Sequence, residues 1–142
     1  MRAKEYEAIY KRDDPARLEE QLSLANLIKN CFKGQTVPET ACGTGYWTRY
    51  LAETAEKVTA IDSSPEMLKI AQAKYLGEHV KFVAGNAYDL KDIPGKFSGG
   101  MACFWFSQVP KAMLSEFLGG FRKKLSLGSV LMFTDNNYIP GV

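Results

Sequence analysis

The sequence predicts a single α/β domain with a mainly parallel sheet of about five strands and helices on both faces. The chain has 142 residues, 46% of them apolar, which suffices for one compact core and is too little for two. After a first helix, short apolar runs alternate with segments of helical character. Such alternation specifies parallel strands joined by right-handed crossovers that cover both faces of a sheet. We find no repeat, low-complexity tract or long linker, so residues 1–142 form one domain, with a helical segment at 1–33 and a core at 35–135.

The first helix is predicted over residues 15–32. Asp14 is suited to the N-cap and Pro15 to the first helical position, and Gly34 follows the end of the helix. Apolar residues at helical spacing form one stripe: Leu18, Leu22, Ala25, Ile28 and Cys31.

Five strands and three further helices follow. The strands are expected at 37–41, 58–61, 80–84, 101–106 and 130–133, and the helices at 46–55, 65–75 and 110–125. The segment 92–100 is rich in turn residues and has room for a short or irregular helix.

Charge and hydropathy argue against several classes of protein. Eighteen Lys and Arg against sixteen Asp and Glu give a net charge of +2, spread along the chain, so we expect no nucleic-acid partner. The N-terminus lacks the apolar core of a secretory signal, and no apolar run approaches the roughly 20 residues that span a bilayer. We therefore expect a soluble, cytoplasmic protein without a membrane partner.

The cysteines predict neither a disulfide framework nor a metal site. Cys31, Cys42 and Cys103 are odd in number and far apart, and His79, expected at the surface before a strand, is the single histidine. Cys42 is a candidate nucleophile, but an activated thiol needs a nearby base. A small apolar residue under a glycine turn is the favoured interpretation.

The most informative segment lies where the first strand meets the next helix. It reads Glu39-Thr-Ala-Cys-Gly43-Thr-Gly45. The glycines permit positive φ and remove Cβ atoms that would block a ligand, and Glu39 can accept hydrogen bonds from an amine or from the turn. An ordinary strand-to-helix turn explains a lone glycine pair equally well.

Asp62 at the end of the second strand favours a ligand. It lies seventeen residues after Gly45, and an acid at this place in a βαβ unit accepts hydrogen bonds from ribose hydroxyls. Ser63 or Ser64, before Pro65, is better placed to cap the following helix, which leaves Asp62 free for a nucleoside.

Three stretches, TACGTGYWTRYLA, VTAIDSSPEML and VKFVAGNAYDL, resemble successive motifs of class I S-adenosylmethionine (SAM)-dependent methyltransferases, which have a Rossmann-like fold. The resemblance covers about residues 35–135 and implies SAM as the cofactor. It places the methionine end of SAM at the glycine turn, the ribose at the second-strand acid and the adenine beyond it. The residues so implied are Glu39, Ala41, Gly43, Gly45, Asp62, Ser63, Met67, Asn86 and Ala87.

The fourth strand, in MACFWFSQVP, is similar to a stretch of some small-molecule methyltransferases, which implies a small-molecule acceptor. Phe104, Trp105, Tyr46 and Trp47 are candidates to face the sulfonium through cation–π contact, although at least two of them should be core residues. Tyr10 either closes over the cofactor or simply packs. No catalytic base can be named, because positioning alone supplies much of the rate for reactive nucleophiles.

Two other functions stay open. The domain could bind SAM without turnover, or it could be a nicotinamide-binding Rossmann module. The second is weaker, because Thr48 stands where the dinucleotide fingerprint needs its third glycine.

The sequence departs from the family at Pro38 and at the C-terminus. A proline removes a ladder donor, so Pro38 should lie at a strand start or at a disrupted edge. The family's last two strands, an antiparallel hairpin, have no counterpart here. We expect a fifth strand buried on both faces whose edge is open to self-association, or to a covering by the tail after Thr134.

Overall fold

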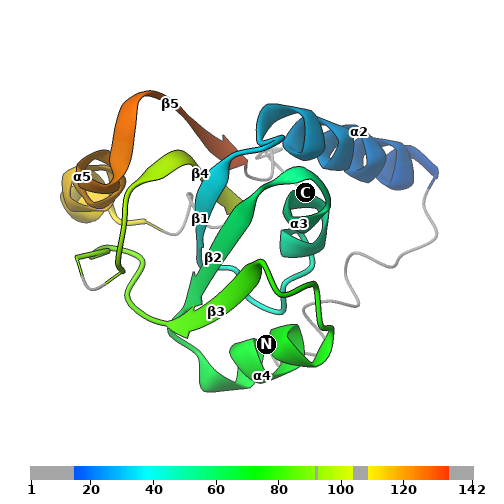
Figure 1. Ribbon diagram of the computed structural model, residues 1–142, viewed down its shortest axis with the longest axis horizontal. Helices are drawn as coiled ribbons and strands as arrows, with labels where there is room; N and C mark the ends of the chain where they lie inside the picture. The colour runs from blue at the N-terminus through cyan, green and yellow to red at the C-terminus, as the bar shows by residue number, and fades with distance from the viewer. Residues whose placement is uncertain (1–14, 92, 104–108, 135–142) are drawn as a thin grey trace, which may run out of the picture.

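The computed structural model describes residues 15–91, 93–103 and 109–134 (Figure 1). Its elements in chain order are α2 (Pro15–Cys31), β1 (Thr36–Thr40), α3 (Thr48–Thr54), β2 (Lys57–Asp62), α4 (Pro65–Ala73), β3 (Val80–Ala84), β4 (Phe97–Cys103), the 3₁₀ helix η3 (Lys111–Met113), α5 (Leu114–Lys124) and β5 (Leu125–Thr134). The strands form one sheet in the order β3-β2-β1-β4-β5, and each described pairing is parallel. The predicted doubly wound α/β fold is confirmed.

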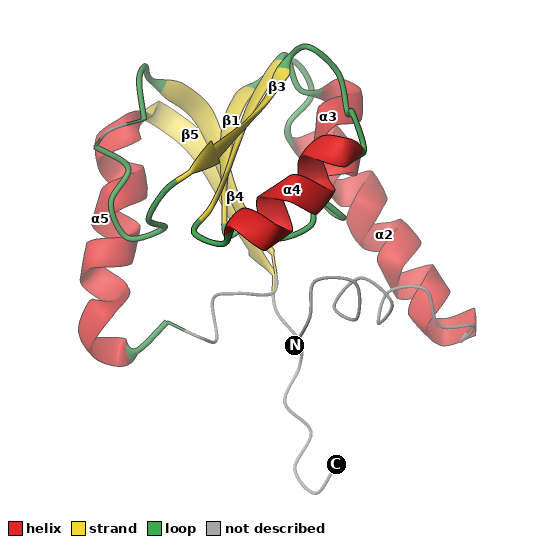
Figure 2. Cartoon of the chain, turned by 90° about the horizontal axis from the view of Figure 1, so that it is seen from below, coloured by secondary structure: helices red, strands yellow, loops and turns green. Residues whose placement is uncertain are grey.

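Helices cover both faces of this sheet, as Figure 2 shows, with α2, α3 and α4 on one side and α5 on the other. One buried cluster lies under α2 and α3 and includes Ile28, Phe32, Val37, Leu51 and Met101. The second joins α5 to the opposite face through Phe117, Phe121, Ile61, Phe97 and Ala102. In the described ranges, no helix is long and apolar enough to cross a membrane.

The apolar stripe of α2 is only half buried. Ala25 and Ile28 are 2% and 0% exposed, whereas Leu18 and Leu22 are 43% and 62% exposed. The helix runs past the sheet at its N-terminal end (Figure 2), so the first turns have no sheet beneath them. Asp14, the expected cap, lies outside the described residues.

Two glycines made the start of β4 look like a turn. The strand begins at Phe97, so the expectation of turn structure is wrong from that residue onward. A Cβ on Gly99 would lie 2.9 Å from the ring of Phe32, and a Cβ on Gly100 would lie 2.8 Å from Leu131 and 2.9 Å from Phe121. These strand glycines therefore admit large side chains that pack on both faces of the sheet.

Pro38 lies in the middle of central strand β1 and not at its start. Thr36 donates its N–H to Ser98 Oγ on the β4 side at 3.0 Å. Because N–H groups two residues apart point to the same neighbour in a parallel strand, the position of Pro38 also faces β4. The register on that side is reduced to Glu39 with Met101, whereas β1 pairs with β2 along its whole length. Proline is thus tolerated where the ladder is interrupted.

Among the described strands β5 lies at the edge of the sheet, and the expectation that both of its faces are buried is wrong. None of its ten residues is fully buried, and Leu127 and Val130 are 106% and 50% exposed. Its pairing jumps from Phe97 with Leu125 to Gly99 with Val130, so residues 126–129 loop out of the ladder, with Gly128 at φ 84°. Beyond this excursion Phe133 packs on Phe117 and Phe121, which covers one face.

We predict that the 142-residue chain self-associates through β5. Among the described strands none pairs with its outer side, and unpaired N–H and C=O groups favour pairing with another strand. Sedimentation over a concentration series should show a dimer, and Val130→Lys should abolish it, because a charge on an edge strand opposes pairing. A strictly monomeric wild type with protected β5 amides would contradict this and favour a tail that covers the edge.

Candidate functional site

The candidate site lies at the carboxyl ends of β1 and β4, where the strand order reverses. In open α/β sheets ligands bind at this switch point. The turn after β1 has positive φ at Ala41 (54°), Gly43 (58°) and Gly45 (79°). Strand β1 therefore ends at Thr40, one residue before the predicted end, and α3 begins at Thr48 and not at Tyr46.

Gly45 is required by packing as well as by φ. A Cβ there would lie 3.2 Å from the Cβ of Ala71 in α4 and 3.7 Å from the ring of Phe82. The glycine turn thus lets α4 approach the start of α3. Ala41 shares the left-handed conformation without the freedom of glycine, which costs an L-residue roughly 1–2 kcal/mol.

Asp62 joins the two segments that the sequence singled out. Its Oδ2 accepts a hydrogen bond from the Gly43 N–H at 2.9 Å, and its Oδ1 accepts one from the Ser64 N–H at 2.8 Å. The sequence predicts Asp62 as an acceptor for a ligand but gives no sign of these two backbone partners. Each carboxylate oxygen still has capacity for a further donor. Ser64 caps α4 as predicted, with its Oγ accepting from the Met67 N–H.

Glu39 lies behind the turn and is 2% exposed. The hydroxyl of Thr48, in the first turn of α3, donates to its Oε1. Burial raises the pKa of Glu39 to about 8; the Thr48 hydrogen bond acts against this rise, and the Asp62 charge adds to it. At neutral pH the carboxyl group is therefore mainly protonated, and a cation placed beside it would favour the ionised form.

Sequence reasoning noted Thr48 only as a missing glycine and did not find its role as the partner of Glu39. An acid on the strand followed nine residues later by a hydroxyl in the next helix was the available signal. Thr40 and Thr44 were missed as well. Both are fully buried, and their Oγ1 atoms have no hydrogen-bond partner within the described structure. Buried hydroxyl groups are seldom left without a hydrogen-bond partner, so these two hydroxyl groups are available to hydrogen-bond a ligand at the turn.

The predicted adenine residues lie on two neighbouring segments after β2 and β3. Ser63 is exposed and Met67 half-buried at the start of α4. Asn86 is exposed, and its Oδ1 accepts from the Tyr88 N–H at 2.9 Å. Ala87 packs against the cluster under α5. The structure thus brings the second-strand and third-strand residues to the same edge of the sheet as the glycine turn.

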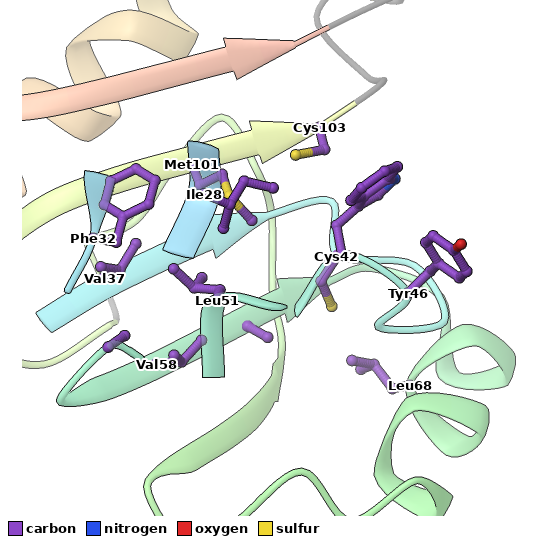
Figure 3. Packing of buried hydrophobic residues seen from close by; sticks show 13 residues of the cluster. Ile28, Phe32, Val37, Cys42, Tyr46, Leu51, Val58, Leu68, Met101 and Cys103 are labelled. Carbon is purple, nitrogen blue, oxygen red and sulfur yellow. The ribbon is translucent and has the colours of Figure 1, made fainter. Parts of the chain in front are cut away.

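The aromatic candidates divide into core residues and residues without a described position. Tyr46 and Trp47 are 7% and 4% exposed and belong to the cluster under α2 and α3. The Tyr46 hydroxyl donates to Gln21 Oε1 of α2 at 3.2 Å, and burial is the main cause that raises its pKa. Figure 3 shows Tyr46 beyond the arrowheads of the central strands. Tyr10, Phe104 and Trp105 lie outside the described residues.

The cysteines fit packing better than catalysis. Cys42 and Cys103 are buried at the carboxyl ends of β1 and β4 (Figure 3), and burial raises the pKa of both thiols, that of Cys103 to about 12. Such thiols are poor nucleophiles at neutral pH. His79 is half-buried rather than a free surface residue, and its Nε2 lies 2.6 Å from the Ala52 carbonyl of α3. Among the described residues no group of potential ligands could hold a metal.

Comparison with known proteins assigns this architecture to a family. The model of the methyltransferase domain family matches residues 37–128. The chain therefore belongs to the methyltransferase domain family, and its fold is the Rossmann-like fold of SAM-dependent methyltransferases.

Individual relatives agree with this assignment. An uncharacterized methyltransferase of Synechocystis is 30% identical over 115 residues, 81% of this chain and 52% of that protein. The malonyl-[acyl-carrier protein] O-methyltransferase of Serratia marcescens is 30% identical over 86 residues, 56% of this chain and 32% of that protein. The structure titled "DhpI-SAM-HEP complex" superposes with a TM-score of 0.79 at 28% identity, covering 97% of this chain and 62% of that one. The chain spans about half or less of the length of these curated relatives.

We predict that Ala41→Gly stabilises the protein by up to about 1 kcal/mol. Glycine relieves the strain of a left-handed alanine, which stabilises the folded state. It also has the larger backbone entropy in the unfolded chain, and the free-energy cost of losing that entropy on folding offsets part of the gain. Urea unfolding of both proteins measures it. As a control, Ala25→Gly in the interior of α2 should destabilise by roughly 1 kcal/mol or more, because its backbone is helical and its methyl group is buried. A destabilised Ala41→Gly variant would show that the Cβ of Ala41 contributes packing that outweighs its strain.

Proposed function

We propose that this chain is the SAM-binding domain of a methyltransferase that transfers a methyl group to a small-molecule acceptor. The observation that carries the proposal is the Asp62 carboxylate at the end of β2, which is hydrogen-bonded to both the glycine turn after β1 and the start of α4. A ribose placed there meets an acceptor already oriented by two backbone N–H groups.

Residues around the turn after β1 and the ends of β2 and β3 support a place for each part of the cofactor. Glu39 supplies a buried acid for the ammonium group of SAM, and the Thr44 hydroxyl offers an unsatisfied polar group in the same turn. Ala41, Gly43 and Gly45 form the turn around the methionine portion. The ribose then lies at Asp62. Ser63, Met67, Asn86 and Ala87 border the adenine in this proposal. Tyr46 completes the described part of the cofactor set, and Tyr10 and Phe104 stay in it as predictions from the sequence alone.

A methylated sulfonium supplies an electrophilic methyl group, and the protein's part is to hold the donor and acceptor in line. Orientation of this kind accounts for much of the rate enhancement in bimolecular transfers. Packing of α4 at Gly45 and a backbone hydrogen bond hold the glycine turn and Asp62 in place, so contacts within the protein fix the shape of the donor site. We assign no catalytic base.

The acceptor is proposed only as a class. The relatives include a malonyl-[acyl-carrier protein] O-methyltransferase, and one structural neighbour is the DhpI-SAM-HEP complex. A small-molecule acceptor and a cytoplasmic location are consistent with the sequence. A domain that binds SAM without turnover is the second candidate, favoured by β5 as the last strand of the described sheet.

Calorimetry with SAM, its demethylated product S-adenosylhomocysteine (SAH), and NAD tests the proposal. We expect SAM and SAH to bind and NAD not to bind, because Thr48 occupies the place of a fingerprint glycine and bonds Glu39. Binding of NAD alone would overturn the proposal. Product formation with a panel of acceptors then separates an active enzyme from a binding domain.

Asp62→Ala should weaken SAH binding by roughly 1–3 kcal/mol, because the ribose loses a charged acceptor. Ser64→Ala is the matched control. It removes the cap of α4 but keeps the backbone N–H that bonds Asp62, so it should cost roughly 1 kcal/mol of stability and lower the affinity less than Asp62→Ala does. Unchanged SAH affinity in a folded Asp62→Ala variant would contradict the ribose assignment.

SAH binding at pH 7 should release close to one proton. With a pKa of about 8, Glu39 is mainly protonated in the free protein, and we expect the ligand's ammonium group to lower this pKa to well below 7, so that the bound carboxyl group is ionised. The release should decline as the pH rises through 8, where the free carboxyl group is already ionised. Calorimetry in buffers of different ionisation enthalpy measures the number of protons.

Two controls isolate this effect. Glu39→Gln should bind without proton release, and 5′-methylthioadenosine, which lacks the amino-acid portion, should release none from the wild type. Equal release with both ligands would exclude Glu39 as the source.

A further inference from the structure

Helix α5 contains two adjacent glycines, Gly119 and Gly120, in the interior of its eleven residues. Apart from proline, glycine is the least favourable residue inside a helix. A Cβ on Gly119 would meet nothing within 4 Å, whereas a Cβ on Gly120 would lie 3.1 Å from the carbonyl oxygen of Tyr88. Only Gly120 therefore has a packing reason to lack a side chain: it lets the backbone of the β3–β4 connection lie against α5.

Tyr88 belongs to the same turn as Asn86, the proposed partner of the adenine. The Tyr88 N–H donates to Asn86 Oδ1 at 2.9 Å, and the Asp89 N–H donates to the Asn86 carbonyl at 3.1 Å. These bonds fix the Asn86 side chain relative to the backbone of Tyr88. Any shift of the Tyr88 carbonyl away from α5 therefore moves Asn86 as well.

The same face of α5 holds the connection at other points. Phe117, three residues before Gly120, packs edge-on against the Tyr88 ring with centroids 6.2 Å apart. Lys124, four residues after Gly120, donates its Nζ to the Ile93 carbonyl at 2.6 Å. Residues at this spacing share one side of a helix. Figure 1 shows the β3–β4 connection beside α5.

We propose that Gly120 is a positioning residue for the cofactor: its missing side chain seats the Tyr88 backbone on α5 and thereby sets the position of Asn86 at the adenine end. This inference rests on the proposed function. It adds Gly120 as a determinant of cofactor affinity, although α5 contributes no residue to the proposed cofactor set.

The test compares Gly120→Ala and Gly120→Val with Gly119→Ala, the neighbouring position where a Cβ has open space. The probes are SAH and 5′-methylthioadenosine, which share the adenine and differ in the amino-acid portion. Gly120→Val should weaken both by the same factor, roughly tenfold, as for a lost hydrogen bond. Gly120→Ala should weaken both ligands by a smaller factor. This variant tests the proposal even if Gly120→Val does not fold. Gly119→Ala should leave both affinities unchanged.

Amide exchange in the ligand-free protein provides a readout independent of binding. The Tyr88 and Asp89 amides should exchange faster in Gly120→Ala than in Gly119→Ala, whereas a global loss of stability would accelerate amides throughout the core. Unchanged exchange at these two amides, or unchanged affinity in folded Gly120→Val, would overturn the proposal. If the wild type binds neither ligand, the proposed function fails, and the role of Gly120 toward a cofactor fails with it. If the wild type binds both ligands but the Gly120 substitutions leave the affinities unchanged, only the role of Gly120 fails.

Discussion

The hydrogen bonds of Asp62 are the constraint on which the site depends. One carboxylate at the end of β2 accepts from the turn after β1 and from the first residue before α4, so a single side chain sets the spacing of three segments. Gly45 supports the same arrangement by packing: because it has no Cβ, Ala71 of α4 can lie directly against the turn after β1. A ribose acceptor and a structural tie are thus the same group.

Glu39 shows how the core and the site share one face of the sheet. Its strand neighbour Val37 packs under α2 and α3, while Glu39 itself is kept buried by the helix start that carries Thr48. Burial of an acid without a basic partner among the described residues is unfavourable for the charged form. A cationic ligand relieves this cost, which gives the turn a preference for a positively charged group.

The sheet accommodates two irregularities at β4, each in its own way. Pro38 faces a sparse ladder that the Ser98 hydroxyl bridges, and Gly99 and Gly100 give space to aromatic rings on opposite faces. The sequence indicated turn structure at Gly99 and Gly100, whereas it placed Pro38 in a strand. Packing of Phe32 and Phe121 outweighs the turn signals of the two glycines, because buried aromatic area stabilises a strand more than glycine destabilises it.

The sequence by itself determined the alternation of strands and helices, the parallel sheet and the edge at which Glu39, Asp62 and Asn86 meet, since apolar periodicity and glycine spacing are local signals. It could not determine where β4 begins, how little of β5 is buried or that Asp62 has two backbone partners. Each of these properties depends on residues distant in the chain. Phe32 packs on Gly99 in β4, Gly43 donates to Asp62, and the burial of β5 depends on its place at the edge of the described sheet. Tertiary packing decided them, because burial and hydrogen-bond partners are properties of neighbours in space rather than in sequence.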